Sequence, residues 1–385
     1  MAEFIAFHVP DIGDEEIDAV TNTLRSGWLT TGNKVKQLED EFAAMVGARY
    51  AIAVNSCTAA LHLALEAAGI GAGDEVIVPT MTFAATAEVV TYFKAKPVLV
   101  DCTSDSMNID PDAVERHLTS RTKAIIPVHF AGHPCEMDKL LNLARRHGVQ
   151  IIEDAAHAVP ARYKGKMIGT IGDATCFSFY ATKNMTTGEG GMVTTEKRDW
   201  AARIRAMSLH GLSRDAWNRY TAHGSWSYEI LAPGFKYNLT DIAAALGIPQ
   251  LHKSERFWKA RERYAALYND AFRDIPEILR PCVADEVQHA WHLYVIQLDL
   301  ERLRIDRNEF IELLRERQIA CSVHFIPLHL HPYYRDAWGY QAAQFPVATR
   351  VFERVVSLPL YAKMTESEVY RVIEAVTDVI AMCRR

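Results

Sequence analysis

Hydrophobic and polar positions in the first half of the chain follow a rhythm that predicts strands and helices in alternation. Residues 35–46 place their apolar side chains on one helical stripe, and Gly47 follows as a C-terminal cap. Strands are expected from five short apolar, β-branched runs, at residues 51–54, 75–79, 97–101, 123–128 and 149–154. Strands separated by helices of about 10 to 15 residues are typical of a mostly parallel sheet covered on both faces.

The pattern changes in the second half of the chain. A long amphipathic helix is expected at about residues 251–272, and the remainder mixes strands, such as 292–300 and 320–325, with helices. Single cores stop growing near ~250 to 300 residues, so 385 residues favour two domains. The prediction is an α/β fold: a large domain at residues 1–250 and a small α+β domain at residues 251–385.

Composition and charge narrow the possible partners. With 42 Lys and Arg against 48 Asp and Glu, the formal charge is −6, which argues against a dedicated nucleic-acid binder. The seven cysteines are scattered and form no Cys-x-x-Cys pair, so a disulfide framework or zinc ribbon is not expected. The N-terminus lacks the pattern of a signal peptide, and no apolar run reaches the ~18 residues of a membrane span. A cytoplasmic protein without nucleic-acid or membrane partners is expected.

Polar residues follow several of the predicted strands. They lie at 55–58, 79–83, 153–157 and 178–184. Because open parallel sheets bind ligands beyond the carboxyl ends of their strands, these segments should meet at one edge. That edge would hold a loop of small residues, an aromatic side chain, an acid and a lysine.

This set of groups matches the needs of pyridoxal phosphate (PLP). The cofactor requires a lysine amine for a Schiff base, a carboxylate at its ring nitrogen and donors for its phosphate. Lys183, Asp154 and a helix starting at Thr58 could supply them, and Phe83 could cover a ring face. Taken singly, Asp154 could equally be a loop cap and Lys183 a solvated surface charge.

Several longer segments resemble the DegT/DnrJ/EryC1/StrS family of sugar aminotransferases. They are SGWLTTG (26–32), NSCTAALHLAL (55–65), GDEVIVPTMTFAAT (73–86), EDAAHA (153–158), FSFYATKNMTTGEGGMV (177–193) and GFKYNLTDIAAALG (234–247). Within the family, HGLSRDAW (210–217), LAPGFKYNLTD (231–241) and HAWHLYVI (289–296) are most similar to the UDP-4-amino-4-deoxy-L-arabinose–oxoglutarate aminotransferase branch. The resemblance implies the aspartate-aminotransferase fold (fold type I) and a homodimer with shared active sites.

The resemblance also implies roles for individual residues. Lys183 matches the Schiff-base lysine, Asp154 the acid at the pyridine nitrogen, and His157 the residue beside the phenolic oxygen. The remaining cofactor positions match Thr58, Ala59 and Ser178 at the phosphate, Phe83 against the ring, and Lys236 and Asn238 in GFKYN. Many members read Gly-Tyr-Asn-Tyr-Arg there, so Lys236 replaces the asparagine that reaches the neighbouring subunit's phosphate; a lysine would act as a point charge.

The reaction implied is amino transfer from an amino acid, usually L-glutamate leaving as 2-oxoglutarate, to a nucleotide-linked 4-keto sugar. Surface-polysaccharide biosynthesis is the expected setting. The alternatives are amination of a cyclic ketone without a nucleotide, a PLP-dependent sugar dehydratase, whose lysine is replaced by histidine, and a PLP-binding sensor, which would carry an added DNA-binding module.

Other polar residues have two interpretations each. His329 could contact the sugar or its diphosphate, and Trp28, Thr30 and Thr31 could line the substrate mouth; ordinary packing is the alternative. His129 and His133 stand four residues apart with Cys135 nearby, which resembles the spacing of metal ligands. They follow a strand in a loop and do not lie on a predicted helix, and no clear third ligand is evident, so no metal site is expected.

Overall fold

The computed structural model describes residues 3–213 and 228–385. Its centre is a seven-stranded sheet in the order β1-β9-β8-β5-β4-β2-β3. The strands are β1 (Tyr50–Val54), β2 (Glu75–Pro79), β3 (Lys96–Val100), β4 (Thr122–Ile125), β5 (Gln150–Asp154), β8 (Ala174–Ser178) and β9 (Gly191–Thr195). Only β9 runs against the others of this sheet. The predicted mostly parallel sheet is therefore confirmed.

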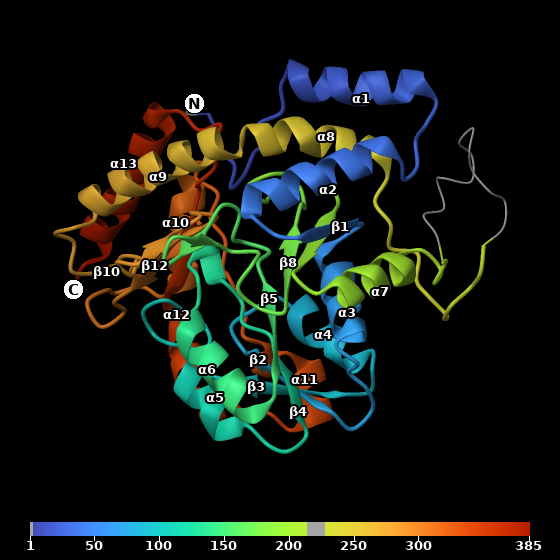
Figure 1. The fold of residues 1–385 in the computed structure, drawn as a ribbon. Coiled ribbons are helices and arrows are strands. Elements are labelled where there is room, and N and C mark those ends of the chain that lie inside the picture. Colours follow the sequence, from blue (N-terminus) through green and yellow to red (C-terminus); the bar gives the residue numbers. More distant parts are fainter. Residues whose placement is uncertain (1–2, 214–227) are drawn as a thin grey trace.

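Helices cover both faces of this sheet (Figure 1). The side chains of Val76 and Val78 enter one core with helices α3, α4 and α7, whereas Ile77 enters another with α5 and α6. Helices α2 and α8 close the remainder of the second face over β1 and β8. Their bounds are α2 (Asn33–Val46), α3 (Cys57–Ala67), α4 (Ala85–Thr91), α5 (Pro111–His117), α6 (Met137–His147), α7 (Arg198–Ser208) and α8 (Asp241–His252). Burial on both faces explains why these strands read as continuous apolar runs.

A second, antiparallel sheet lies in the C-terminal part of the chain. It consists of β10 (Ile278–Leu279), β12 (Tyr294–Leu298) and β13 (Val355–Leu358). Its core includes residues of α9 (Ser254–Ala271), α10 (Arg307–Glu316) and α13 (Glu366–Cys383). The other helices are α1 (Asp14–Ser26), α11 (Pro332–Trp338) and α12 (Pro346–Arg354), with short 3₁₀ turns at Phe130–Gly132, Leu328–Leu330 and Ala342–Gln344. The domain boundary at residue 250 stays a prediction.

Short pairings join the two parts. Strand β11 (Val287–Gln288) pairs with β6 (Arg162–Tyr163), which also pairs with β7 (Lys166–Met167). The loops at 131 and 292 are tied by two hydrogen bonds from the His292 and Leu293 amides to the Ala131 carbonyl, 3.0 and 3.2 Å long. These pairings bring the residues near 292 against the edge of the large sheet.

Three predicted elements differ in detail. The helix expected to start at Thr58 begins at Cys57, because the Ser56 side chain caps it by accepting from the Ala59 amide. The long helix expected at 251–272 is divided between α8 and α9 at Lys253. The strand expected at 320–325 contributes one isolated bridge, between Ser322 and Ser357. No helix among the described residues is long and apolar enough to cross a membrane.

Candidate active site

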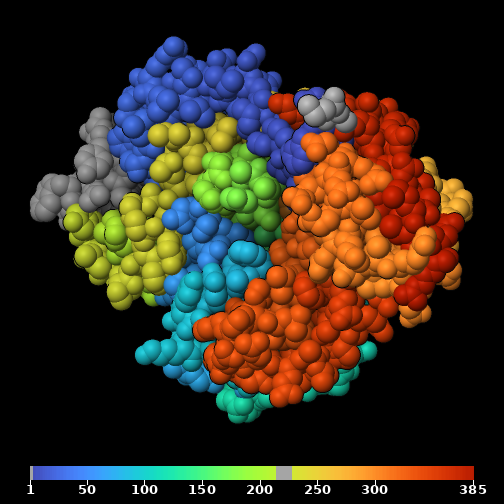
Figure 2. Space-filling model, turned by 180° about the vertical axis from the view of Figure 1, so that it is seen from behind, coloured from blue at the N-terminus to red at the C-terminus, as the bar shows by residue number. Residues whose placement is uncertain are grey.

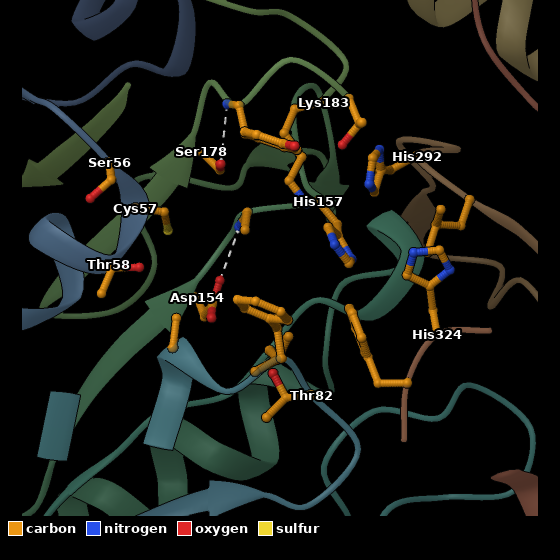
Figure 3. Close-up of a pocket in the computed structure, with 18 of the residues that line it drawn as sticks. Ser56, Cys57, Thr58, Thr82, Asp154, His157, Ser178, Lys183, His292 and His324 are labelled. Atoms are coloured by element: carbon orange, nitrogen blue, oxygen red, sulfur yellow. Dashed lines mark hydrogen bonds between the residues drawn. The ribbon is translucent and has the colours of Figure 1, made fainter. Parts of the chain in front are cut away.

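A cavity of about 450 Å³ opens at the carboxyl ends of the central strands. It lies between the large sheet and the C-terminal part of the chain, and its polar lining residues come from segments far apart in the sequence (Figure 3). They are His8, Ser56, Cys57, Thr58, Thr82, Asp154, His157, Ser178, Tyr180, Thr182, Lys183, Glu189, His292 and His324, with Phe7, Phe83 and Phe325 among the apolar ones. The sheet edge predicted to gather the polar residues does so.

Lys183 follows β8 in a loop whose position is fixed by its neighbours. Its amide donates to the Tyr180 carbonyl at 2.9 Å, and the next side chain, Asn184, donates to the Val159 and Ala290 carbonyls at 2.7 and 2.8 Å. Burial lowers the pKa of the Lys183 amine to about 8, against the opposing effect of Cys57 and Asp154. A buried amine of this kind is largely neutral in mildly alkaline solution and is therefore a nucleophile and a base.

Asp154 ends β5 and points into the same cavity (Figure 3). Its Oδ1 accepts from the Ala156 amide at 3.1 Å, and its Oδ2 accepts from the Thr86 hydroxyl at 2.8 Å. Burial raises the pKa of this carboxyl, while the Thr86 hydrogen bond, the Ala156 amide and the Lys183 charge lower it. The net effect is a pKa above the ordinary value, and the two donors fix the position of the carboxyl group and oppose its protonation.

The start of α3 forms another wall of the cavity. Ser56 uses its side chain on the Ala59 amide, and no partner accepts from the Cys57 or Thr58 amides within the described ranges. Gly191 lies against this turn: a Cβ there would lie 2.5 Å from the Ser56 carbonyl carbon. Glycine therefore allows β9 to approach a helix start that offers free N–H groups and a positive dipole end to an anion.

Four imidazoles, those of His8, His157, His292 and His324, line the cavity near Lys183. Burial lowers the pKa of each, to about 3 for His8 and about 4 for His324, so all four are neutral at physiological pH. The Ala131 amide donates to Nδ1 of His157 at 3.3 Å, which leaves its proton on Nε2. His157 therefore presents a donor to the cavity.

These groups fit pyridoxal phosphate. One cavity of ligand size is surrounded by a buried amine, a carboxyl group held by two donors, an imidazole donor and the start of the 11-residue helix α3 with its free amides. The Phe83 ring lies on the rim and is 64% exposed, so one face is open to cover a bound ring. The cofactor needs these groups, and the described residues supply them.

Several predicted site residues lie outside the cavity wall. The Trp28 indole donates to the Thr31 carbonyl, and the Thr31 hydroxyl accepts from the Asn238 amide at 2.7 Å. Lys236 is exposed and donates to Asn238 at 2.7 Å, while its carbonyl accepts from Asn55, one residue before the α3 cap. This segment therefore runs beside the phosphate end of the cavity.

His329 is buried away from the other site residues. Its Nδ1 lies 2.8 Å from the Thr80 hydroxyl and its Nε2 lies 3.0 Å from the Thr349 hydroxyl, and its ring stacks on Phe345. These contacts are those of a packed, hydrogen-bonded histidine, which was the alternative to a substrate contact for His329. The two histidines with metal-like spacing also contact protein groups. His129 Nε2 lies 3.0 Å from Glu153, and Nδ1 of His133 contacts Asn108 and the Pro134 carbonyl.

Sequence reasoning missed some lining residues. His292 and His324 lie inside motifs that were noted for resemblance or histidine content, so a signal was present. His8 gave no such signal, because it does not follow the end of a predicted strand. Thr86, which bonds Asp154 behind the cavity wall, lies in the segment 73–86 that carries the resemblance, but no role was predicted for it. The segment HGLSRDAW (210–217) is described only as far as Ser213, and residues 214–217 lie outside the described residues.

Comparison with known proteins places the chain in a family. The model of the DegT/DnrJ/EryC1/StrS aminotransferase family matches residues 10–377. The spore coat polysaccharide biosynthesis protein SpsC of Bacillus subtilis is 53% identical over 378 residues, which cover 98% of this chain and 97% of that protein.

Solved structures agree with this placement. The putative sugar aminotransferase Spr1654 of Streptococcus pneumoniae, in its PMP-form, is 36% identical with a TM-score of 0.92 and covers 98% of this chain and 99% of its own. Helicobacter pylori PseC, an aminotransferase involved in pseudoaminic acid biosynthesis, is 27% identical with a TM-score of 0.91, covering 99% and 100%. The chain therefore belongs to the DegT/DnrJ/EryC1/StrS aminotransferase family and is a PLP-dependent sugar aminotransferase of fold type I.

Proposed function

We propose that this enzyme moves the amino group of L-glutamate to a 4-keto sugar linked to a nucleotide, in a ping-pong cycle that releases 2-oxoglutarate. The observation that supports it best is one cavity holding a buried amine, Lys183, a carboxyl group held by two donors, Asp154, and the open start of α3. The relative SpsC is a spore coat polysaccharide biosynthesis protein, which favours a product used in a surface polysaccharide.

In the proposed site each residue contacts a defined part of the cofactor. When bound, the cofactor supplies an electron-accepting ring. Lys183 holds it through the amine, and Asp154 holds a proton at the ring nitrogen. Nε2 of His157 donates to the phenolic oxygen. Ser178, Thr58 and the free amides of Cys57 and Thr58 bind the phosphate, and Phe83 covers a face of the ring. The Ala59 amide, which the resemblance assigned to the phosphate, already donates to the Ser56 side chain at 3.0 Å.

Lys183 has a second task once the donor amino acid has taken its place. The freed amine, with a pKa of about 8, removes the proton from the donor's α-carbon and returns it to the cofactor side. The same amine then works in reverse when the keto sugar enters. The four neutral imidazoles add no positive charge that would suppress the amine's basicity.

A homodimer completes the proposed site. Exposed apolar side chains lie in the cavity wall, Phe83 (64%) and Tyr180 (46%), and further exposed ones are Tyr92 (52%), Ile230 (68%) and Leu231 (60%). The segments that carry them lie on the same face of the molecule (Figure 2). Exposed apolar clusters of this kind are typical of interaction surfaces. Lys236 and Asn238 run along the same rim and would reach the partner's phosphate.

The nucleotide would lie outside the cavity. A volume of about 450 Å³ is in the lower part of the range for ligand pockets, and the cofactor takes a share of it. The nucleotide would then cross the rim between the two subunits, near Trp28, Thr31 and Lys236. Local donors would neutralise its diphosphate, because the chain as a whole carries −6.

The test begins with the purified protein loaded with PLP. Incubation with glutamate should convert the absorption spectrum to that of the amine form, and a panel of keto substrates is then added, with UDP-4-keto-pentose among them. The expected result is that a nucleotide 4-keto sugar restores the aldehyde spectrum. Restoration only by cyclic ketones without a nucleotide would favour the alternative substrate class. Lys183→Ala is the control, and its conversion by glutamate at the wild-type rate would overturn the proposal.

A further inference from the structure

Two buried threonine hydroxyls lie in line behind Asp154. The Thr86 hydroxyl is 2.8 Å from Oδ2 of Asp154, and the Thr82 hydroxyl is 2.8 Å from that of Thr86. Thr86 is fully buried and Thr82 is 2% exposed, so water does not compete for these bonds. Both belong to one short segment, in which Thr86 lies in the first turn of α4, whereas Asp154 ends β5.

The direction of each hydrogen bond follows from the chemistry of the groups. An ionised carboxylate only accepts, so Thr86 must donate its single proton to Asp154. The Thr86 oxygen is then left to accept, so Thr82 donates to it. The Ala156 amide donates to the other carboxylate oxygen at 3.1 Å. Each oxygen of Asp154 therefore has one fixed donor, and the plane of the carboxylate is set.

These bonds oppose the cost of burying Asp154. Burial alone raises the pKa of this carboxyl, and the hydrogen bond from Thr86 is the largest influence that lowers it. A buried carboxyl without such donors takes up a proton and becomes neutral. A neutral Asp154 could no longer hold a proton on a ring nitrogen beside it.

We propose that Thr86 is a positioning residue, which keeps Asp154 ionised and oriented so that the cofactor's ring nitrogen stays protonated. Thr82 supports it by directing the Thr86 proton toward the carboxylate. This inference rests on the proposed role of Asp154. It assigns a task to a hydroxyl that does not touch the cofactor and acts only through Asp154.

The test uses enzyme loaded with PLP that carries ¹⁵N in its ring, and it reads the chemical shift of that nitrogen. Thr86→Val removes the hydroxyl and keeps the branched shape. Its signal should move toward that of an unprotonated ring, with a smaller move for Thr82→Val. Thr91→Val is the matched control, because the Thr91 hydroxyl bonds the Glu88 carbonyl in the same helix, away from Asp154. Its signal should stay at the wild-type position.

A second measurement is the binding of PLP to the cofactor-free protein as a function of pH. A hydrogen bond to a charged group corresponds to a pKa change of about one to two units. Loss of Thr86 raises the pKa of Asp154, so the pH below which binding weakens should rise by that amount. Thr91→Val should leave this pH unchanged.

Asp154→Asn separates the two levels of the proposal. If Asp154→Asn moves the ring signal and Thr86→Val does not, the inference about Thr86 is wrong and the role of Asp154 stands. If neither variant moves it, both are wrong. A Thr86→Val protein that unfolds is replaced by Thr86→Ala or Thr86→Ser; Thr86→Ser retains a hydroxyl and should restore the wild-type signal, and failure to restore it contradicts the inference.

Discussion

The reactivity of Lys183 comes from its surroundings, since an exposed lysine would be protonated at neutral pH. Burial lowers the pKa of its amine to about 8, and the nearby Asp154 and Cys57 limit the shift. The four imidazoles around it stay neutral for the same reason, burial. Burial of individual residues therefore determines the protonation states on which the chemistry of this site depends.

A pH dependence follows for Lys183. Only the neutral amine attacks an aldehyde, and a lowered pKa means that this form predominates above about pH 8. The rate at which cofactor-free protein captures PLP should therefore rise with pH and level off a little above 8, as followed by visible absorption. The rate for a free lysine derivative, measured in the same way, should continue to rise with pH up to its own pKa of about 10.4. A protein rate that climbs in parallel with this control would contradict the account.

At the scale of elements, the close approach of β9 to the start of α3 positions the turn that is proposed to bind the cofactor's phosphate. A Cβ at Gly191 would meet the Ser56 carbonyl carbon at 2.5 Å and the Cys57 amide nitrogen at 2.8 Å. Both neighbours are backbone atoms, so the helix start itself would have to move. The phosphate-binding amides would move with it.

Gly191→Ala should therefore lower both stability and cofactor affinity. Overpacking of a buried site costs about 1–3 kcal/mol of unfolding free energy, which denaturant titration measures. PLP titration should show weaker binding in the same variant. Gly71→Ala is the matched control, since its Cβ would meet only the Asp74 carboxylate at 4.0 Å, and it should stay within about 0.5 kcal/mol of wild type. Equal behaviour of the two variants would show that the close approach has no such effect.

The elements also show how far the sequence leads. The central strands were predictable because burial on both faces requires apolar runs, and the polar residues after them, such as Asp154 and Lys183, were predictable from strand ends. The break between α8 and α9 could not be predicted, because the apolar pattern continues through it. At this break the Lys253 amine binds the Glu16 carboxylate of α1, a contact that only the tertiary fold shows. The Thr86 bond joins residues 68 positions apart, so only the tertiary fold reveals it.

At the scale of the whole molecule, the cavity lies between the seven-stranded sheet and the C-terminal part of the chain, and its wall includes the exposed apolar side chains of Phe83 and Tyr180. On the same face, Ile230 and Leu231 are 68% and 60% exposed. Leaving such side chains in water is unfavourable, and a second copy of the chain would cover them. The proposed dimer thus connects assembly with the completion of the site.

Ile230→Glu should weaken that dimer. A charge placed in an apolar contact loses its hydration, so sedimentation at low protein concentration should show mostly monomer, with reduced retention of PLP. Met382→Glu is the control: Met382 is equally large and 57% exposed, but it lies on α13, away from the cavity. It should sediment as the wild type does. A monomeric wild type, or an unaffected Ile230→Glu dimer, would contradict the proposed interface.

The central claim is that Lys183 is the residue that carries the cofactor. The most direct test is to reduce the PLP-loaded enzyme with borohydride, which makes the link to the lysine permanent, and to locate the added mass by peptide mapping. The account predicts the mass on the peptide that contains Lys183, and its loss after prior incubation with glutamate. The mass on another lysine, or no covalent attachment in protein that binds PLP, would contradict it.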